Sequence, residues 1–321
     1  KTMQQLTNIN DIYKTTYNLD NVLYNNKKVL HMNKAELVRI CKDYNFSSFL
    51  TLSQNQVKLK KNLKELNIFT IGMSLAPYSL GNKLDICLNA SLECKKNCVI
   101  WNSGNPAYID AKQNAMVKRK DLLKDNPNLF LAIFLRYIEL YTSYCISKHL
   151  LLSIRFNIAS DIEYENINIV YKNSVNSFSN IADSLIQKTK MNKKLKFKLS
   201  AYDYTKNFNR KDNPKYKIVY SVNDNDNTKI EKAIQNKLSL AMVFDTKRNK
   251  PLPKTYTINN KVFKVIDGDL HDYLPLQQKQ VIIGLRFKYN AKDNKQKREN
   301  KLNKAILQGF VKIANKDIKV I

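Results

Sequence analysis

The sequence is poor in several residue types on which common functional sites depend. Five cysteines, an odd number, do not form the paired framework of a small secreted protein. Its three histidines, His31, His149 and His271, are isolated, so a metal site built on histidine has no support. No run reaches the roughly 18 consecutive apolar residues of a membrane span, and no apolar signal core opens the chain. We therefore expect a soluble, cytoplasmic protein without a membrane partner.

Acidic residues are also scarce, and this bears on the partner. The chain has 27 Asp and Glu against 55 Lys and Arg, a formal net charge of +28. Such an excess favours a polyanion, and nucleic acid is the commonest one. A bias of the genome toward lysine and asparagine codons is the alternative, although it does not by itself keep acidic residues few. We expect nucleic acid, with DNA preferred, as the partner.

Strand-like apolar runs recur along the chain from residue 151 onward. Six of them end in clusters of polar residues, most of which contain an aspartate. Runs of this kind indicate buried parallel strands joined by crossovers. In parallel sheets and barrels, the chemistry lies at the carboxyl ends of the strands. The pattern therefore favours an enzyme of the α/β class.

The order of elements predicts one large domain preceded by an accessory segment. Residues 1–65 are polar and rich in lysine and asparagine, and we expect an N-terminal helical extension there, with a helix capped by Asn33. Residues 66–321 then alternate strands with helical connections. This alternation predicts a TIM-like full or partial (β/α) barrel as the catalytic domain.

Two helices are expected between the first core strand, residues 68–75, and the later alternation. The first covers about residues 107–124 and the second about 127–148. Asn126 has the position of an N-cap, and Pro127 suits the first turn because its missing N–H is not needed there. The apolar stripe of the second helix is typical of a core helix.

Cys87, Cys94 and Cys98 lie in one loop directly after the first core strand. Thiolates at this density can converge on one zinc ion or on an iron–sulfur cluster. Radical-SAM enzymes also place their cluster loop after the first barrel strand, but with three and then two intervening residues, whereas here the gaps are six and three. Packing residues in a folded loop are the alternative. The sequence alone does not decide between metal or cluster ligation and packing.

The strand ends supply the candidate site residues. The candidate catalytic residues are the carboxylates Asp161, Asp203 and Asp269. The candidate substrate-binding residues are Asn157, Tyr202, Tyr204, Lys206, Arg286 and Lys288. A carboxylate at a strand end can act as base or nucleophile when neighbours set its pKa. Because parallel strands bring their carboxyl ends to one side, we expect a single pocket there.

The neighbours of these carboxylates have chemistry that suits nucleic acid. Tyr202 and Tyr204 flank Asp203 and are candidates to stack on a base. Lys206 follows them and is a candidate to hold a phosphate or lower the carboxylate pKa. Asp269 belongs to the densest acidic run, in which Gly268 permits a tight turn or a close backbone approach.

Several separated motifs, in the same order, give the chain a resemblance to a family of uncharacterised bacteriophage and plasmid proteins. They extend over residues 68–288 and comprise SLAPYSLG, the three-cysteine loop, the Asn157–Asp161 stretch, YDYTK, VIDGD followed by Asp272, and GLRFK. The resemblance implies a phage or mobile-element origin in a bacterial host. It also implies that these positions form one site, but it supplies no reaction.

Three functions compete on these observations. The first is a transferase that modifies nucleic-acid bases by N-glycosidic exchange through strand-end aspartates, with the base extruded from the duplex. The second is an iron–sulfur, radical-SAM-like enzyme that uses the three-cysteine loop. The third is a non-catalytic nucleic-acid-binding protein in replication or anti-defence. Carboxylates outnumber cysteines at the strand ends, so base exchange is the first expectation.

Overall fold

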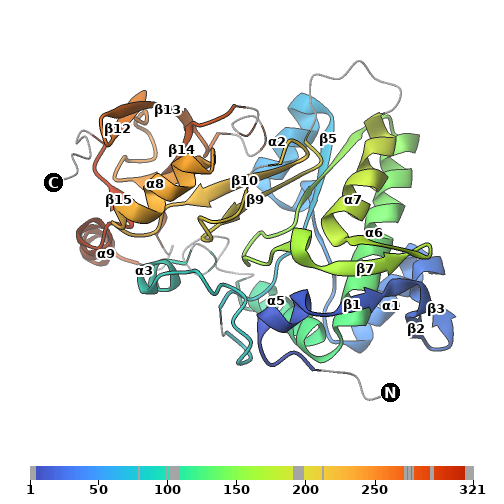
Figure 1. Ribbon diagram of the computed structural model, residues 1–321. Helices are drawn as coiled ribbons and strands as arrows, with labels where there is room; N and C mark the ends of the chain where they lie inside the picture. Colours follow the sequence, from blue (N-terminus) through green and yellow to red (C-terminus); the bar gives the residue numbers. More distant parts are fainter. Residues whose placement is uncertain are drawn as a thin grey trace. The chain divides into compact units, whose positions relative to one another are not determined.

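The computed structural model describes residues 5–78, 80–98, 100, 109–190, 199–211, 213–270, 273, 276, 278–289 and 293–314 (Figure 1). The chain forms two compact units. Unit 1 contains Lys1–Leu88 and Asp110–Ala201, and unit 2 contains Asn89–Ile109 and Tyr202–Ile321. Both units combine helices with strands, so the predicted α/β class is confirmed.

Unit 1 begins with short elements, and its two longest helices precede its last strands. Its helices are α1 (Lys34–Asp43), α2 (Val57–Leu66), α5 (Ile109–Asp125), α6 (Pro127–Ser147) and α7 (Phe178–Gln187). Its strands are β1 (Thr16–Asn18), β2 (Leu23–Tyr24), β3 (Lys27–Lys28), β4 (Thr51–Leu52), β5 (Ile68–Gly72), β6 (Leu151–Arg155), β7 (Asn168–Tyr171) and β8 (Ser174–Ser177). Short 3-10 helices lie at Ile9–Tyr13, Leu19–Asn21, Val29–His31, Ser53–Asn55, Tyr164–Asn166 and Lys188–Lys190.

The N-terminal segment contains the predicted helix but is more than a helical extension. Asn33 caps α1 and forms a capping box with Glu36, as its sequence position indicates. The segment also supplies strands, because β1 pairs with β7 and β4 pairs with β5. The boundary expected at residue 65 therefore does not coincide with a boundary between compact units.

Helix α6 is the core helix of unit 1. Asn126 accepts a hydrogen bond from the Leu129 N–H, and Pro127 occupies the first turn, as predicted. Phe134 lies within aromatic contact of Phe130, Phe156 and other buried rings. Length and composition alone would allow α6 to span a membrane, but 67% of its most apolar window is buried inside the protein. Burial of this extent is what a core helix shows.

Unit 2 contains the second group of predicted strands. Its strands are β9 (Ala201–Thr205), β10 (Tyr216–Ser221), β11 (Ser239–Phe244), β12 (Thr255–Ile258), β13 (Lys261–Asp267), β14 (Ile282–Arg286) and β15 (Val311–Lys312). Its helices are α3 (Leu92–Lys96), α8 (Asn227–Gln235) and α9 (Lys295–Leu307). The strand order is β12-β13-β14-β11-β10-β9, and β15 also pairs with β11. The pairs β10–β11, β11–β14 and β13–β14 are parallel.

The predicted TIM-like barrel is not found among the described residues. The strand order in unit 2 is linear and reaches an edge at β12, which pairs with β13 in antiparallel fashion. A two-residue turn at Asn259 and Asn260, both with positive φ, joins these two strands. Such hairpin turns match the twist of antiparallel strands. A barrel of repeating parallel units has no place for this hairpin, and the sheet is open and mixed instead.

Candidate functional site at the carboxyl edge of the unit 2 sheet

Four parallel strands of unit 2 end at one edge of their sheet. The pairing places Ser221 of β10 opposite Ala241, Phe244 of β11 opposite Arg286, and Asp267 of β13 opposite Gly284. We call the side on which these strands end the carboxyl edge. Polar side chains gather there because the apolar runs stop and the loops begin.

A cluster of carboxylates and cations follows β13 and β14 at this edge. The Arg286 Nη1 atom lies 2.8 Å from an oxygen of Asp267 and 3.5 Å from an oxygen of Asp269. The Arg286 backbone N–H also donates to Asp269, at 2.8 Å. Lys288 Nζ lies 3.8 Å from the other Asp269 oxygen. The structure thus brings together Asp269, Arg286 and Lys288, three of the predicted site residues.

Gly268 makes this cluster possible through a close backbone approach. Its N–H donates to the Gly284 carbonyl, at 2.8 Å. A Cβ atom at this position would lie 2.4 Å from Ile283 Cγ2, which is less than any real Cβ contact. The expected close approach is therefore present, and it fixes Asp267 and Asp269 on either side of the turn.

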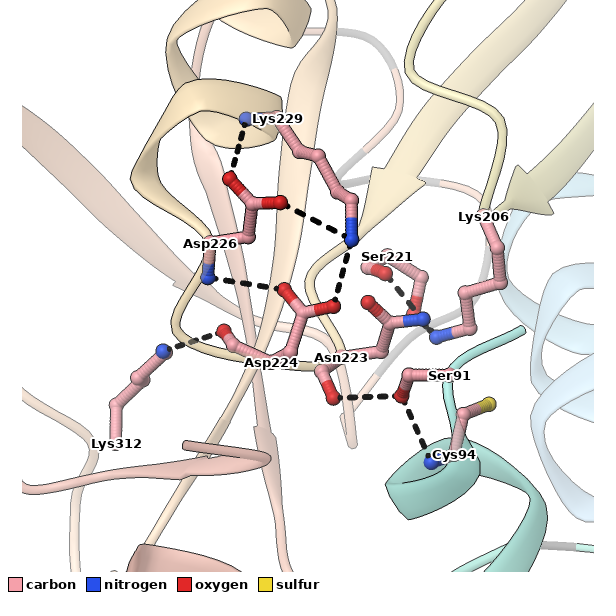
Figure 2. A network of polar contacts seen from close by, with 9 residues as sticks. All are labelled: Ser91, Cys94, Lys206, Ser221, Asn223, Asp224, Asp226, Lys229 and Lys312. Atoms are coloured by element: carbon pink, nitrogen blue, oxygen red, sulfur yellow. Dashed lines mark hydrogen bonds and ion pairs between the residues drawn. The ribbon is translucent and has the colours of Figure 1, made fainter. Parts of the chain in front are cut away.

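A second polar network lies at the end of β10 (Figure 2). Lys206, which follows β9, donates from Nζ to the Ser221 carbonyl and hydroxyl, at 3.1 and 2.6 Å. Lys229 forms ion pairs with Asp224 and Asp226, at 3.1 and 3.2 Å. Burial opposes the charge of Lys229, but the bonds to both carboxylates raise its pKa above the usual value. Through its two bonds to Ser221, Lys206 stabilises the end of β10.

Lys312 completes this network from the other end of the chain. Its Nζ donates to the Asp224 carbonyl and to Asn225 Oδ1, both at 2.9 Å. Burial lowers its pKa to about 8, although Asp224 acts in the opposite direction. Sequence reasoning missed Lys312 because nothing in a lysine-rich C-terminal segment separates a buried lysine from an exposed one.

Ser91 connects α3 with the β10 network (Figure 2). Its hydroxyl accepts from the Cys94 N–H as an N-cap and donates to the Asn223 carbonyl, both at 3.1 Å. The predicted ligand Cys94 is therefore carried by a short helix that is fastened to the carboxyl edge. Sequence reasoning also missed Ser91, although a serine directly before the first residue of a helix is the usual N-cap signal.

Asp203 does not join the cluster at the carboxyl edge. It lies inside β9, fully buried, and accepts a short hydrogen bond from the Tyr216 hydroxyl. That hydroxyl accepts in turn from Arg210, at 3.0 Å. Four strand spacings separate β9 from β13, about 19 Å at ~4.8 Å each. The single pocket expected for Asp203 and Asp269 is not formed.

Tyr202 differs from its expected role, whereas that of Tyr204 stays a prediction. Tyr202 is fully buried and its ring meets that of Tyr273, with centroids 6.1 Å apart. A ring in the core has no face available to a base. Tyr204, two residues further along the same strand, is half-buried. His271 and Asp272, which continue the acidic run, lie outside the described residues.

Asp161, Asn157 and Cys87 belong to unit 1. The buried Asn157 side chain accepts from the Ser160 hydroxyl and the Ile162 N–H and donates to the Ile162 carbonyl, at 2.7 to 2.9 Å. Its amide thus holds the loop that carries Asp161. The Asp161 N–H donates to the Ile86 carbonyl, at 3.0 Å. The Cys87 thiol donates to the Ala159 carbonyl, at 3.7 Å. These contacts join the cysteine loop to the Asp161 loop within unit 1.

A family model described as "Gene product 88" matches residues 50–302 of the chain. The protein belongs to the Gene product 88 family. This membership agrees with the expected phage-type family of uncharacterised proteins. No curated protein and no solved structure matches the chain.

The Gene product 88 match contains every candidate site residue. It begins at residue 50, just before β4, and ends within α9. Most of the accessory segment at residues 1–65 lies outside it. The match therefore includes the strands from β4 to β14 and the loops that carry the aspartates and cysteines.

The three-cysteine metal site stays a prediction for this Gene product 88 protein. Cys94 lies in α3, Cys98 follows that helix, and Cys87 belongs to the other unit. The described residues contain no group of three or more His, Cys, Asp or Glu side chains that could hold a metal ion. Val99 and the segment 101–108, which follow Cys98, lie outside the described residues.

Proposed function

We propose that this protein is a nucleic-acid-modifying enzyme that exchanges a base at its N-glycosidic bond, with Asp269 as the reacting carboxylate. The observation that supports it is the cluster of Asp267, Asp269, Arg286 and Lys288 at the carboxyl edge of a parallel sheet. The chain that carries this cluster has a net charge of +28. A carboxylate with fixed cationic neighbours and a basic protein surface are the two parts that such a reaction requires.

The reaction divides into two matched displacements. The basic surface holds the phosphates, and the target base is extruded from the stack. The Asp269 carboxylate attacks the sugar carbon, the C–N bond breaks, and the base leaves with the electron pair and takes up a proton. An incoming base then attacks the same carbon, loses a proton, and displaces Asp269. Arg286 and Lys288 orient the carboxylate and hold the neighbouring phosphate.

We assign the other aspartates different roles. Asp203 is fully buried and bound to Tyr216, so we assign it to the fold. Asp161 belongs to unit 1, where it is half-buried in the loop that Asn157 holds, and we give it no step in this reaction. Asp267 shares Arg286 with Asp269 and supports the geometry of the pair.

Incorporation of labelled free bases into DNA and RNA tests the proposal. The protein is incubated with each nucleic acid and one labelled base at a time, and acid-precipitable label is measured. We expect label from one base with the wild type and a loss of at least 100-fold for Asp269→Asn, which keeps the shape and removes the charge. Asp125→Asn, in unit 1 and with a side chain that is 48% exposed, serves as the matched control and should retain full activity.

A second candidate is binding without catalysis, as in a replication or anti-defence protein. It is favoured by the same cluster, because both Asp267 and Asp269 already have Arg286 as a cationic partner. Salt-dependent binding without incorporation of any base would select this candidate. Absence of both binding and incorporation would overturn the two proposals together.

A further inference from the structure

Helix α9 of unit 2, labelled in Figure 1, is strongly basic. Its sequence, KQKRENKLNKAIL, contains five basic residues and one acidic residue. Like charges three or four positions apart destabilise a helix by about 0.2–0.5 kcal/mol per pair. Lys297, Lys301 and Lys304 follow each other at these spacings and form one stripe. We call these three residues the α9 stripe.

Helix α9 buries few side chains, so packing against the core does not explain why this helix is present. Ala305 is its one buried residue, and Leu307 is 83% exposed. Asn294 caps its amino end through a hydrogen bond to the Lys297 N–H, at 2.9 Å. A helix that is polar on nearly all sides and this short is marginal by itself. The Asn294 cap and the chain that follows α9 therefore hold the helix in place, and its charged side chains face solvent.

The protein neutralises the α9 stripe only in part. Asp293 forms ion pairs with Lys297 and Lys301, at 3.1 and 2.6 Å. These two lysines lower the pKa of Asp293. Among the residues that the structure describes, Lys304 has no ion pair with a carboxylate. The stripe therefore keeps an excess of positive charge toward solvent.

The chain on both sides of α9 ties the helix to the carboxyl edge. Arg298 lies over the Tyr289 ring, 6.0 Å from its centroid, and Tyr289 follows Lys288 of the aspartate cluster. After α9, β15 pairs with the end of β11, and Lys312 bonds to the loop after β10 (Figure 2). Gly309, with positive φ, permits the turn between them and leaves no room for a Cβ beside Asn225.

From this geometry we infer that the α9 stripe is a phosphate-binding surface for the nucleic acid on which the carboxyl edge acts. The inference rests on the proposed function. Seven residues of helix separate Lys297 from Lys304, about 10.5 Å at ~1.5 Å per residue. One DNA strand carries a phosphate about every 3.4 Å of axis, so the stripe matches about three phosphates. A polyanion removes the like-charge repulsion that the helix otherwise retains.

Fluorescence anisotropy with a labelled duplex, repeated with a single strand, tests the inference in K297Q/K304Q. This variant leaves Lys301 paired with Asp293, and circular dichroism checks that α9 is retained. The slope of log K against log salt should fall by about two, roughly one for each lysine. The control K254Q/K279Q removes the same charge from exposed positions outside α9 and should keep the wild-type slope.

The outcomes separate this inference from the proposed function. A wild type that binds with a steep salt dependence, together with equal slopes for the two variants, overturns the role of α9 and leaves the proposed function standing. A wild type that binds neither duplex nor single strand at low salt overturns the proposed function and the inference with it. A reduced slope in K297Q/K304Q alone supports the α9 stripe.

Discussion

Asp203 and Asp269 show that the surroundings of an aspartate decide whether it is a core residue or a candidate for catalysis. In the sequence both follow apolar runs and both are candidates for catalysis. In the structure, β9 continues past Asp203 to Thr205, so the carboxylate is enclosed within the sheet, whereas Asp269 lies beyond the end of β13. Local sequence cannot locate a strand end to within two residues, and that interval separates a core carboxylate from one at the edge.

We expect Asp203→Asn to destabilise the protein. The change weakens the hydrogen bond that the buried Asp203 carboxylate accepts from Tyr216, and it removes a negative charge near the buried Arg210. Loss of such a buried partner costs about 1–3 kcal/mol of unfolding free energy. Urea denaturation followed by circular dichroism measures the change. Asp125→Asn, at a half-buried position near the protein surface, should stay within about 0.5 kcal/mol of the wild type. Equal stability of the two variants would contradict a structural role for Asp203.

Lys312 predicts a specific pH dependence of stability. Its pKa falls from 10.5 to about 8 on folding, so between these values the unfolded chain binds more protons than the folded one. Stability therefore rises with pH from about 8 toward 10, by at most ~1.4 kcal/mol per pH unit for one group. Below pH 8 both states are protonated and this contribution is constant.

Comparison of the wild type with K312M isolates this contribution from other groups. Cys41, whose pKa burial raises to about 11, acts in the opposite direction in both proteins and cancels in the difference. Urea midpoints between pH 7.5 and 9.5 should rise more steeply for the wild type than for K312M. If the urea midpoints of the two proteins changed with pH in the same way, the pKa of Lys312 would not be lowered by folding.

The three cysteines predict a metal dependence that elemental analysis can measure. If Cys87, Cys94 and Cys98 share a ligand, protein purified without oxygen contains stoichiometric zinc or iron, and replacing any one by alanine releases it. Iron with a visible absorption band would favour the radical-type alternative, whereas zinc would indicate a structural site. Cys145→Ala, in the core helix α6, is the matched control for loss of a thiol. Metal-free wild-type protein would return the three cysteines to a packing role.

At the scale of elements, the sequence patterns located the described strands of five or more residues but not the order of the strands. The expected strands correspond to β5, β6, β9, β10, β11, β13 and β14, because each is an apolar run, and all of them except β13 are mostly buried. The caps of α1 and α6 followed from Asn33, Asn126 and Pro127. The shorter strands were not predicted, namely β1, β2, β3, β4, β7, β8, β12 and β15. Strand order and barrel closure depend on pairings between distant segments, which a local pattern does not contain.

Ser91 predicts a coupling between α3 and the loop after β10. Replacing it by alanine removes the N-cap of α3 and the bond to the Asn223 carbonyl, a loss of about 0.5–2 kcal/mol. Hydrogen exchange should become faster in both α3 and residues 223–226. Ser177→Ala, the cap of α7, removes a purely local bond and should affect α7 alone. Faster exchange confined to α3 in Ser91→Ala would show that the bond to Asn223 contributes nothing.

At the scale of the whole molecule, composition predicted the charge but not where it is used. The net charge of +28 follows from counting residues in the sequence. Which lysines and arginines are available to a partner depends on the fold. Lys206, Lys229 and Lys312 form internal bonds, whereas Lys304 has no ion pair with a carboxylate among the described residues. The local sequence does not separate these lysines, so only the folded chain shows which of them we can propose as phosphate-binding.

The net charge predicts opposite effects of salt on the free and the bound protein. Free protein suffers repulsion between like charges, which salt screens over a Debye length of ~10 Å at 0.1 M. Its first unfolding transition should therefore rise by a few degrees between 20 and 300 mM NaCl. Bound nucleic acid at about 100 times Kd adds ~2.7 kcal/mol at low salt, and this addition disappears as counterions compete.

Differential scanning fluorimetry with and without an oligonucleotide measures both curves. The transition of the complex should fall with salt and converge on the rising curve of the free protein. Polyglutamate of equal charge is the control, because it carries negative charge without phosphates or bases. A complex curve that coincides with the free one at every salt concentration would show that the charge does not serve nucleic-acid binding. Equal stabilisation by polyglutamate would show that it serves polyanions in general, since neither bases nor a regular phosphate spacing would then be required.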